Sequence, residues 1–551
     1  MRHIKISLLT LLMIIGMFSC QKDELTTNLE NQTEINSDLE PKGMMVLGKQ
    51  LENPYSVENM KKAYESLKSS GTLKSVTTDT FKVVTNTLYI RFLPKDSSDL
   101  KTLWADTTIE LFDYPMDYEI VEEGFYYHDP EIPECQPTWQ YTSVPVNYQF
   151  PEVQYEIIEE CYIPEDDEED ETELKSSYLG DFYGQLEFEA FRITGNLNEE
   201  STLKSSNGIM AKKKKPAGTI RVDNNAIKSR SSTKIGLEGV MKVKVRVHNF
   251  VKWDSKYTGE DGKYKMDKYY RTNIHYAVVF QNETGFTVWG NWASFACANY
   301  NMGWHSNSGY SRDIYTNSDA WLWASVNNAA YIYREKLCPK FGVSKPPTYT
   351  TIWARNKSNS KWAGSAPMLR HVAFTDAELN SMDIPATFSS DDNSWYLGGF
   401  LPDVFIYKNT DSKTLYSIVF HELSHASHFS KVGQAYWKKY ITHIVNNRGY
   451  GKGTEIYAGY TGVGEMWGNY FGNGICIRDY FGSFSGYFDY EEDWYKPGIL
   501  MRLDDNDGFT PSEIYSCLTL DVNSHMKLKS KLKEKFTKDA QVDSRFGKYS
   551  F

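Results

Sequence analysis

Apolar and polar residues alternate along the middle of the chain with the two-residue period that is typical of β-strands. Three stretches follow this period over most of their length: residues 218–225, 239–250 and 275–282. In the second stretch one side of the predicted strand is basic, and we expect it to be the solvent-facing side of a sheet: Lys242, Lys244, Arg246 and His248. The pair Asp261-Gly262 predicts a turn between strands. This part of the chain is therefore predicted to be β-rich.

Helical spacing and short strand-like runs share the rest of the chain. Two segments place apolar residues at helical spacing, residues 57–69 and 318–338, and the second opens with Ser-Asp at the N-cap position. Strand-like runs are predicted at residues 88–94, 349–355, 369–374 and 403–407, and a further helix around residues 464–476. Helices and strands in this mixed order predict the α+β class.

Two charged runs divide the chain. Pro164–Glu173 is acidic and Lys212–Lys215 is basic, so we expect a linker region over residues 164–216. The predicted organisation is multidomain. It comprises an N-terminal α/β or β-rich module over residues 51–163, a β-sandwich over 217–290 and an α+β domain over 291–551.

The first residues have the pattern of an export signal. A basic start is followed by an apolar stretch from Ile6 to Phe18, which is too short to span a membrane. Ser19-Cys20 then resembles a bacterial lipobox, with Met17 where Leu is usual. The resemblance implies a signal peptide over residues 1–19, lipidation of the Cys20 thiol and a tether over residues 20–50. We therefore expect an exported lipoprotein, anchored to the outer membrane or cell surface of a Gram-negative bacterium.

Composition narrows the classes of protein to which the chain can belong. The 551 residues are 40% hydrophobic, which is enough to build several cores. The net charge of −12 argues against a general nucleic-acid binder, which needs a basic face. Six cysteines besides Cys20 are widely spaced and contain no Cys-x-x-Cys pair, so a thiolate zinc site is not expected.

Residues 420–428 read FHELSHASH and contain the pattern His-Glu-x-x-His. Histidines four positions apart lie one turn apart on the same face of a helix, so His421 and His425 can reach one metal ion. Glu422 lies beside them and can accept a proton from a metal-activated water. Apolar residues before and after the motif predict a half-buried helix, with Asp411 or Ser412 as its N-cap.

A zinc ion in a catalytic site needs a third protein ligand and leaves one position for water. His428 is a candidate, but it lies about 10 Å along a straight helix from His421 and suits a supporting or substrate-contacting role better. Glu455 lies in a Gly-rich stretch. We favour Glu465, because its helical and aromatic surroundings predict burial, and a buried carboxylate requires a partner.

Two resemblances extend this prediction. His-Glu-x-x-His followed by a glutamate on a later helix resembles the gluzincin metallopeptidases of the thermolysin-like clan, over some 130 residues that end at Glu465. Residues 217–290, with the Asp261-Gly262 turn, resemble the transthyretin-like β-sandwich of carboxypeptidase regulatory domains, which implies an accessory module. The C-terminal domain is accordingly identified as zincin-like.

The gluzincin resemblance assigns expected roles to further residues. It implies one zinc ion held by His421, His425 and Glu465, with Asn469 at the position that orients a ligand histidine. It implies an extended substrate bound along residues 403–407. It also implies a side chain that stabilises the oxyanion, for which the sequence leaves four candidates open: Tyr457, Tyr460, Tyr470 and His443.

These observations predict a lipid-anchored zinc metalloendopeptidase that acts on a polypeptide or glycoprotein, with Glu422 as the general base. The alternative is a surface lipoprotein that binds polypeptide or glycan and carries a catalytically inactive zincin domain.

Overall fold

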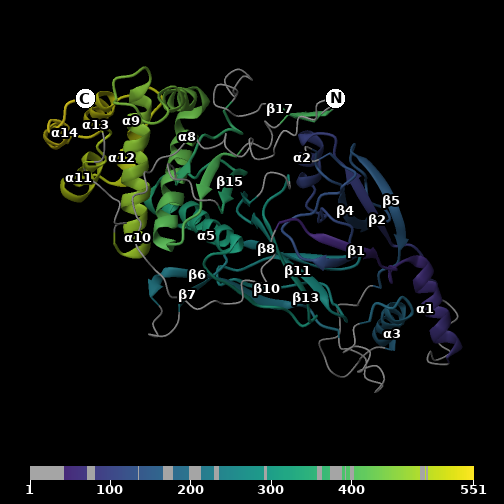
Figure 1. Cartoon of the computed structure of the whole chain (residues 1–551). Coiled ribbons are helices and arrows are strands. Elements are labelled where there is room, and N and C mark those ends of the chain that lie inside the picture. The colour runs from purple at the N-terminus through teal and green to yellow at the C-terminus, as the bar shows by residue number, and fades with distance from the viewer. Residues whose placement is uncertain are drawn as a thin grey trace.

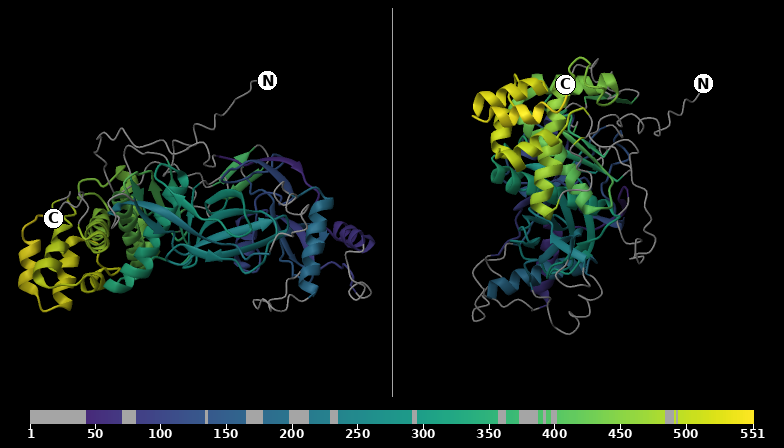
Figure 2. Two further views of the ribbon diagram at one scale, coloured as in Figure 1. Left: turned by 90° about the horizontal axis from the view of Figure 1, so that it is seen from below. Right: turned by 90° about the vertical axis from the view of Figure 1, so that its left-hand side faces the viewer.

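A computed structural model describes residues 43–70, 81–133, 136–164, 178–197, 213–228, 235–290, 295–356, 363–372, 387–390, 393–396, 402–483, 491 and 494–551. The predicted signal peptide, Cys20 and nearly all of the acidic run lie outside these residues. The fold is α+β, as the sequence predicts. The molecule is elongated, with the N-terminal module at one end and the C-terminal helices at the other (Figures 1 and 2).

The N-terminal module combines two small sheets with three helices. Its sheets have the orders β4-β2-β5 and β1-β3. The helices α1 and α3 pack on each other and enclose an aromatic-rich core with these sheets. The elements are β1 (Val46–Gln50), α1 (Val57–Ser69), β2 (Thr87–Leu93), α2 (Ser97–Ala105), β3 (Tyr118–Glu122), β4 (Gln140–Pro145), β5 (Gln154–Cys161) and α3 (Tyr178–Ile193).

The central sheet has the strand order β16-β19-β15-β12-β11-β8-β9, with β13 beside β11. Its strands are β8 (Val243–Asn249), β9 (Lys252–Tyr257), β11 (Ile274–Asn282), β12 (Phe286–Trp289), β13 (Asn299–His305), β15 (Thr350–Arg355), β16 (Gly364–Ser365) and β19 (Val404–Tyr407). A second sheet is built from β6 (Ala217–Lys228), β7 (Ile235–Gly239), β10 (Lys263–Lys265) and β14 (Arg312–Ile314), and β17 (Thr387–Ser390) pairs with β18 (Asn393–Tyr396).

Helices cover one face of the central sheet and continue beyond its β16 end. The face that carries Val288, Ile352 and Ile406 packs against α5 (Asp319–Tyr331) and α8 (Ser412–Asn447). The remaining helical elements are η4 (Ile332–Leu337), α6 (Cys338–Phe341), α9 (Ala458–Trp467), η6 (Gly468–Cys476), α10 (Ile477–Phe481), α11 (Gly498–Asp507), α12 (Pro511–Cys517), α13 (His525–Lys535) and α14 (Asp539–Phe546), of which η4 and η6 are π-helical.

The central sheet crosses the domain boundary that we predicted between residues 290 and 291. β12 pairs in parallel with β15 from Phe286↔Thr350 to Trp289↔Trp353, and β11 pairs with β13. One hydrophobic core extends from the strands of residues 217–290 to the C-terminal helices. The prediction of two separate domains on either side of residue 290 is therefore wrong: these segments fold around one sheet and one core.

The basic stripe on β8 is largely buried, which overturns the prediction of a solvent-facing side. Arg246 donates to the backbone carbonyl of Leu111 (2.7 Å), and its guanidinium lies 4.1 Å above the Phe112 ring. Tyr114 is hydrogen-bonded to His248 Nε2 (2.9 Å). Alternation correctly separates the two sides of a strand, but it does not reveal that the N-terminal module packs on the polar side.

The lysines of this stripe form ion pairs with glutamates. Lys244 pairs with the buried Glu110 of the N-terminal module at 3.0 Å, whereas Lys242 pairs with Glu283 on the surface at 2.9 Å. Burial holds the pKa of His248 well below its usual range, and His275 and Arg246 lower it further. His248 is therefore a neutral, buried contact between the N-terminal module and the central sheet.

Several local predictions can be compared with the elements. Residues 57–69 form α1, and Ser318 caps α5 through the backbone N–H of Trp321, both as predicted. The strand predicted at 369–374 is wrong over its described part, because residues 369–372 form a turn.

Within the described ranges, no helix combines the length and apolar character that crossing a membrane requires. The cysteines described there are free thiols.

The long helix α8 is bent at one glycine. Asp411 caps its start by accepting a hydrogen bond from the backbone N–H of Thr414 (2.7 Å). At Gly433 the backbone has φ 76° and ψ −177°, which is not helical. Glycine reaches this region freely, whereas other residues are strained there. Gly433 therefore separates the segment with the His-Glu-x-x-His motif from a second segment that takes its own direction.

We expect Gly433→Ala to lower the free energy of unfolding by about 1–3 kcal/mol, because a Cβ forces strain at this backbone conformation. A Cβ at Gly433 would meet no atom within 4 Å, so crowding does not contribute. Gly482→Ala is the comparison: Gly482 is equally open, and its left-handed backbone (φ 73°, ψ 4°) strains alanine less, so we expect a smaller loss of stability. Chemical denaturation measures both, and a Gly433→Ala variant as stable as wild type would contradict the bend.

Candidate metal centre

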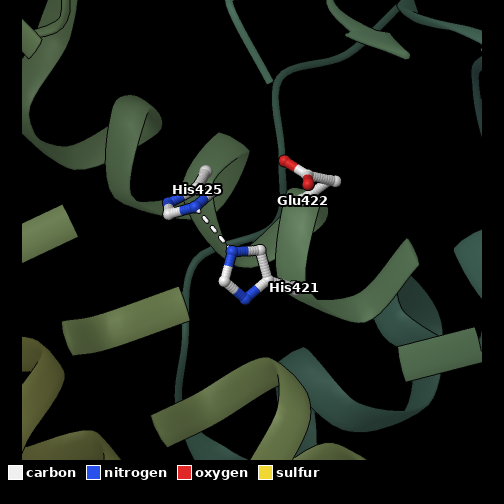
Figure 3. Close-up of side chains that lie close together, drawn as sticks. All are labelled: His421, Glu422 and His425. Atoms are coloured by element: carbon white, nitrogen blue, oxygen red, sulfur yellow. Dashed lines mark hydrogen bonds between the residues drawn. The ribbon is translucent and has the colours of Figure 1, made fainter. Parts of the chain in front are cut away.

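The first segment of α8 presents the His-Glu-x-x-His side chains at one place. His421 and His425 turn their rings toward one another, with their Nε2 atoms 3.0 Å apart, and Glu422 lies beside them (Figure 3). One ligand atom from each of the three residues lies within 4.8 Å of the other two. The three side chains are at most 1% exposed. The helical spacing thus produces the cluster that the sequence predicts.

Glu465 reaches the same point from α9. Its Oε2 lies 3.5 Å from Nε2 of His421, and its Oε1 lies 3.4 Å from Nε2 of His425. Glu465 is fully buried. Burial alone would raise its pKa, but His425, His421 and a tyrosine hydroxyl outweigh burial and lower the pKa of Glu465 below its usual value. Glu465 and the two imidazoles are therefore electrostatically coupled within the protein interior.

The three donors have the spacing that one metal ion requires. Tetrahedral zinc with bonds of 2.0–2.2 Å to nitrogen and oxygen places neighbouring ligand atoms about 3.3 Å apart. The separations of 3.0, 3.4 and 3.5 Å lie near this value, and the two carboxylate distances run to different oxygens of Glu465, Oε2 toward His421 and Oε1 toward His425. Burial lowers the pKa of His425 to about 3, so its imidazole is neutral, as a metal ligand must be. The residues fit a zinc ion.

Glycines allow α9 and η6 to approach α8 this closely. Gly464, Gly468 and Gly472 follow one another at four-residue spacing and therefore lie on one side of the helix. A Cβ at Gly468 would lie 2.8 Å from Cε1 of His425 and 3.0 Å from Cε1 of His421. A Cβ at Gly472 would lie 2.5 Å from Cα of His421. The absence of side chains at these positions thus sets the distance between Glu465 and the histidines.

The strand beside Glu422 is β16, at the edge of the central sheet. β16 pairs antiparallel with β19 through Gly364↔Ile406, and a Cβ at Gly364 would lie 2.8 Å from Oε1 of Glu422. The expected binding of an extended substrate along residues 403–407 is wrong, because β19 already pairs on both sides, with β15 and with β16. The sequence did not predict β16, which is the last strand in the sheet order of the described residues, because it is only two residues long.

His428 does not join the cluster. It is fully buried, and its ring packs against Tyr436 and Trp437, with centroids 5.3 and 5.8 Å apart. Neither ring nitrogen has a hydrogen-bond partner within the described part of the chain. Burial, with smaller contributions from His425 and Lys431, lowers the pKa of His428 to about 3. His428 is therefore a neutral core residue.

Asn469 forms hydrogen bonds along its own helix. Its Nδ2 donates to the Glu465 carbonyl (3.0 Å), and its Oδ1 accepts from Asn473 (2.9 Å). Nδ1 of His421 has no hydrogen-bond partner in the described ranges. Asn469 therefore supports the helix that carries Glu465, and the predicted bond to a ligand histidine is not formed.

The four residues expected near an oxyanion form contacts elsewhere. Tyr470 donates to Asp504 (3.1 Å), and Tyr460 accepts from Asn523 (2.9 Å). Tyr457 lies at the N-cap of α9 with a left-handed backbone and a ring 40% exposed. The fourth, His443, is hydrogen-bonded to Thr461 (2.8 Å).

Glu455, the other carboxylate considered as a ligand, closes the loop before α9. It accepts hydrogen bonds from the backbone N–H groups of Lys452, Gly453 and Thr454, at 2.8 to 3.1 Å. These bonds lower its pKa to about 2. Its Oε2 lies 3.6 Å from Nε2 of His443 and thus ties the loop to α8.

Tyr440 was not predicted, yet its hydroxyl contacts the site directly. It donates a hydrogen bond to Oε1 of Glu465, and its ring centroid lies 5.7 Å from that of His425. Tyr440 follows the bend at Gly433, so no regular helical spacing relates it to the motif. The one signal in the sequence was the glycine itself, within an otherwise helical stretch.

Searches of family models, curated proteins and solved structures found no match for this chain.

We expect Gly468→Ala to weaken zinc binding, because its Cβ would push apart the imidazoles and the helix that carries Glu465. A geometric change at the ligands of this kind typically costs about 10- to 100-fold in metal affinity. Competition with a chromophoric chelator measures the affinity. Gly482→Ala, whose Cβ meets no atom within 4 Å, is the control and should leave it unchanged. Equal affinities for both variants would contradict the close packing.

We expect His428→Leu to retain zinc binding and to reduce the sensitivity of the fold to acid. The folded pKa of about 3 lies below the unfolded value of about 6.5. The unfolded chain therefore binds the extra proton, and the free energy of unfolding falls as the pH falls through this interval. His428→Leu should remove about 2 kcal/mol of the loss between pH 7 and pH 5. Denaturation at both pH values measures this, and loss of zinc would identify His428 as a ligand instead.

Proposed function

We propose that this protein is a zinc-dependent peptidase of gluzincin type. The observation that carries the proposal is the convergence of Glu465, from a separate helix, on the two histidines of the His-Glu-x-x-His motif, with Nε2-to-oxygen distances of 3.4 and 3.5 Å. Two histidines on one helix turn recur in many cores. A buried carboxylate that faces both Nε2 atoms completes the three-ligand set of a catalytic zinc site.

The side chains divide the chemistry between them. His421, His425 and Glu465 would hold the ion, which when bound polarises a carbonyl and lowers the pKa of water toward 7. Glu422 lies beside the two histidines and would act as the base. Its carboxylate accepts the proton of the attacking water and delivers it to the nitrogen of the leaving amine.

The proposed mechanism requires a peptide bond in the substrate, because Glu422 delivers its proton to the nitrogen of a leaving amine. Gly364 on β16 lies next to Oε1 of Glu422 and thus lines the site. A glycoprotein presents the same backbone, and export with a lipid anchor at Cys20 would place the enzyme outside the cell.

The burial of the site favours a second candidate. His421, Glu422, His425 and Glu465 are each at most 1% exposed, so a substrate reaches them only if the structure around β16 opens. A site that stays closed would hold zinc as a structural ion. The protein would then be a surface lipoprotein that binds polypeptide or glycan through its β-rich modules, with an inactive zincin domain.

Two substitutions test the proposed function. We expect Glu422→Gln to retain zinc and to lower peptide hydrolysis by about 10²- to 10⁴-fold, because the amide accepts no proton. Glu465→Ala should lose zinc, because two imidazoles alone hold it weakly. Metal analysis after dialysis and cleavage of a mixed peptide library provide the measurements. Zinc in the wild type without hydrolysis would favour the structural ion, and hydrolysis that survives Glu422→Gln would exclude the mechanism.

A further inference from the structure

Tyr440 is held against Glu465 by contacts with Trp437 and Gly464. The Tyr440 ring stacks on Trp437, with centroids 4.4 Å apart and planes 19° apart. The Trp437 indole N–H donates to the carbonyl of Ala366, one residue after β16 (3.0 Å). Gly464 leaves room for the ring, since a Cβ there would lie 2.7 Å from it. The ring is 3% exposed, so its position is set by packing.

The hydroxyl of Tyr440 reaches the carboxylate oxygen that faces His425. It donates to Oε1 of Glu465, the atom that lies 3.4 Å from Nε2 of His425. The other oxygen, Oε2, faces His421 at 3.5 Å. A carboxylate has two equivalent oxygens and can rotate about its bond to Cγ. A donor fixed on one oxygen opposes this rotation and holds the plane of the carboxylate in one orientation toward the two histidines.

We propose that Tyr440 is the positioning residue of this metal site: its hydroxyl orients Glu465 and thereby sets the affinity of the three-ligand set for zinc. The proposal rests on the proposed function, because it concerns the same ion. Groups that orient a ligand from behind typically contribute about 10- to 100-fold to metal affinity. Here the contribution comes from beyond a bend in α8, so Gly433 and Tyr440 act together.

Tyr440→Phe tests the role, because it removes one hydroxyl and keeps the ring that packs on Trp437. We expect zinc affinity to fall about 10- to 100-fold in competition with a chelator. We also expect the visible absorption of the cobalt-substituted protein to change, because the geometry at Glu465 changes. A purely structural role for Tyr440 would alter stability but neither of these readouts.

Tyr436→Phe is the matched control. Tyr436 lies in the same segment of α8, is 1% exposed and donates its hydroxyl to the carbonyl of Val522 (3.1 Å). Loss of the Tyr436 hydroxyl should lower the free energy of unfolding by about as much as loss of the Tyr440 hydroxyl. The zinc affinity of Tyr436→Phe should stay within about twofold of wild type. A thermal unfolding curve for each variant establishes that both are folded.

A double-mutant cycle separates the outcomes. In a Glu465→Ala background, Tyr440→Phe should have no further effect on the weak residual zinc affinity, because the residue acts through Glu465. An unchanged affinity of Tyr440→Phe in the wild-type background would overturn the role of Tyr440 and leave the metal site intact. Failure of the wild-type protein to bind zinc at all would instead overturn the metal site itself.

Discussion

A buried carboxylate, Glu465, faces two buried imidazoles, and α8 and α9 can hold them together only where glycine keeps the helices close. An ionised carboxylate in a protein interior is strongly unfavourable unless charge or hydrogen bonds compensate it. His421, His425 and Tyr440 supply that compensation in the structure. Their positions follow from the helix packing, and the packing in turn depends on the missing side chains of Gly468 and Gly472.

The same constraint reaches the central sheet. Trp437 supports Tyr440 on one side and is hydrogen-bonded to the backbone that follows β16 on the other. β16 lies against Glu422 through Gly364. The edge strand, the proposed base and the proposed third ligand are thus connected through aromatic packing and one indole hydrogen bond. A displacement of β16 that admitted a substrate would also move Trp437, which packs on Tyr440, the residue proposed to orient Glu465.

The sequence predicted those parts of the site that depend on local geometry. His421, Glu422 and His425 lie together because a helix turn places them together, and Glu465 was identified from its helical, aromatic surroundings. Tyr440 could not be found in this way, because a single glycine with a non-helical backbone interrupts the periodicity between it and the motif. The extent of the sheet was missed for a related reason. A run of alternating residues predicts a strand but not which strand pairs with it. The pairing of β12 with β15 and the burial of Arg246 against the N-terminal module could therefore not be predicted.

The helix that carries Glu465 is poorly suited to be a helix on local grounds. Residues 462–474 contain five glycines, and each glycine in a helix interior costs about 1 kcal/mol relative to alanine. The sum of about 5 kcal/mol is comparable with the whole stability of many domains. Alanine at Gly468 would recover part of this energy but would clash with His421 and His425. Stability alone would favour fewer glycines and a wider helix spacing, which would move Glu465 away from the histidines. The departure from local preference coincides with the candidate metal centre, where His421, His425 and Glu465 converge, and a functional requirement is expected to override local preferences at such a site.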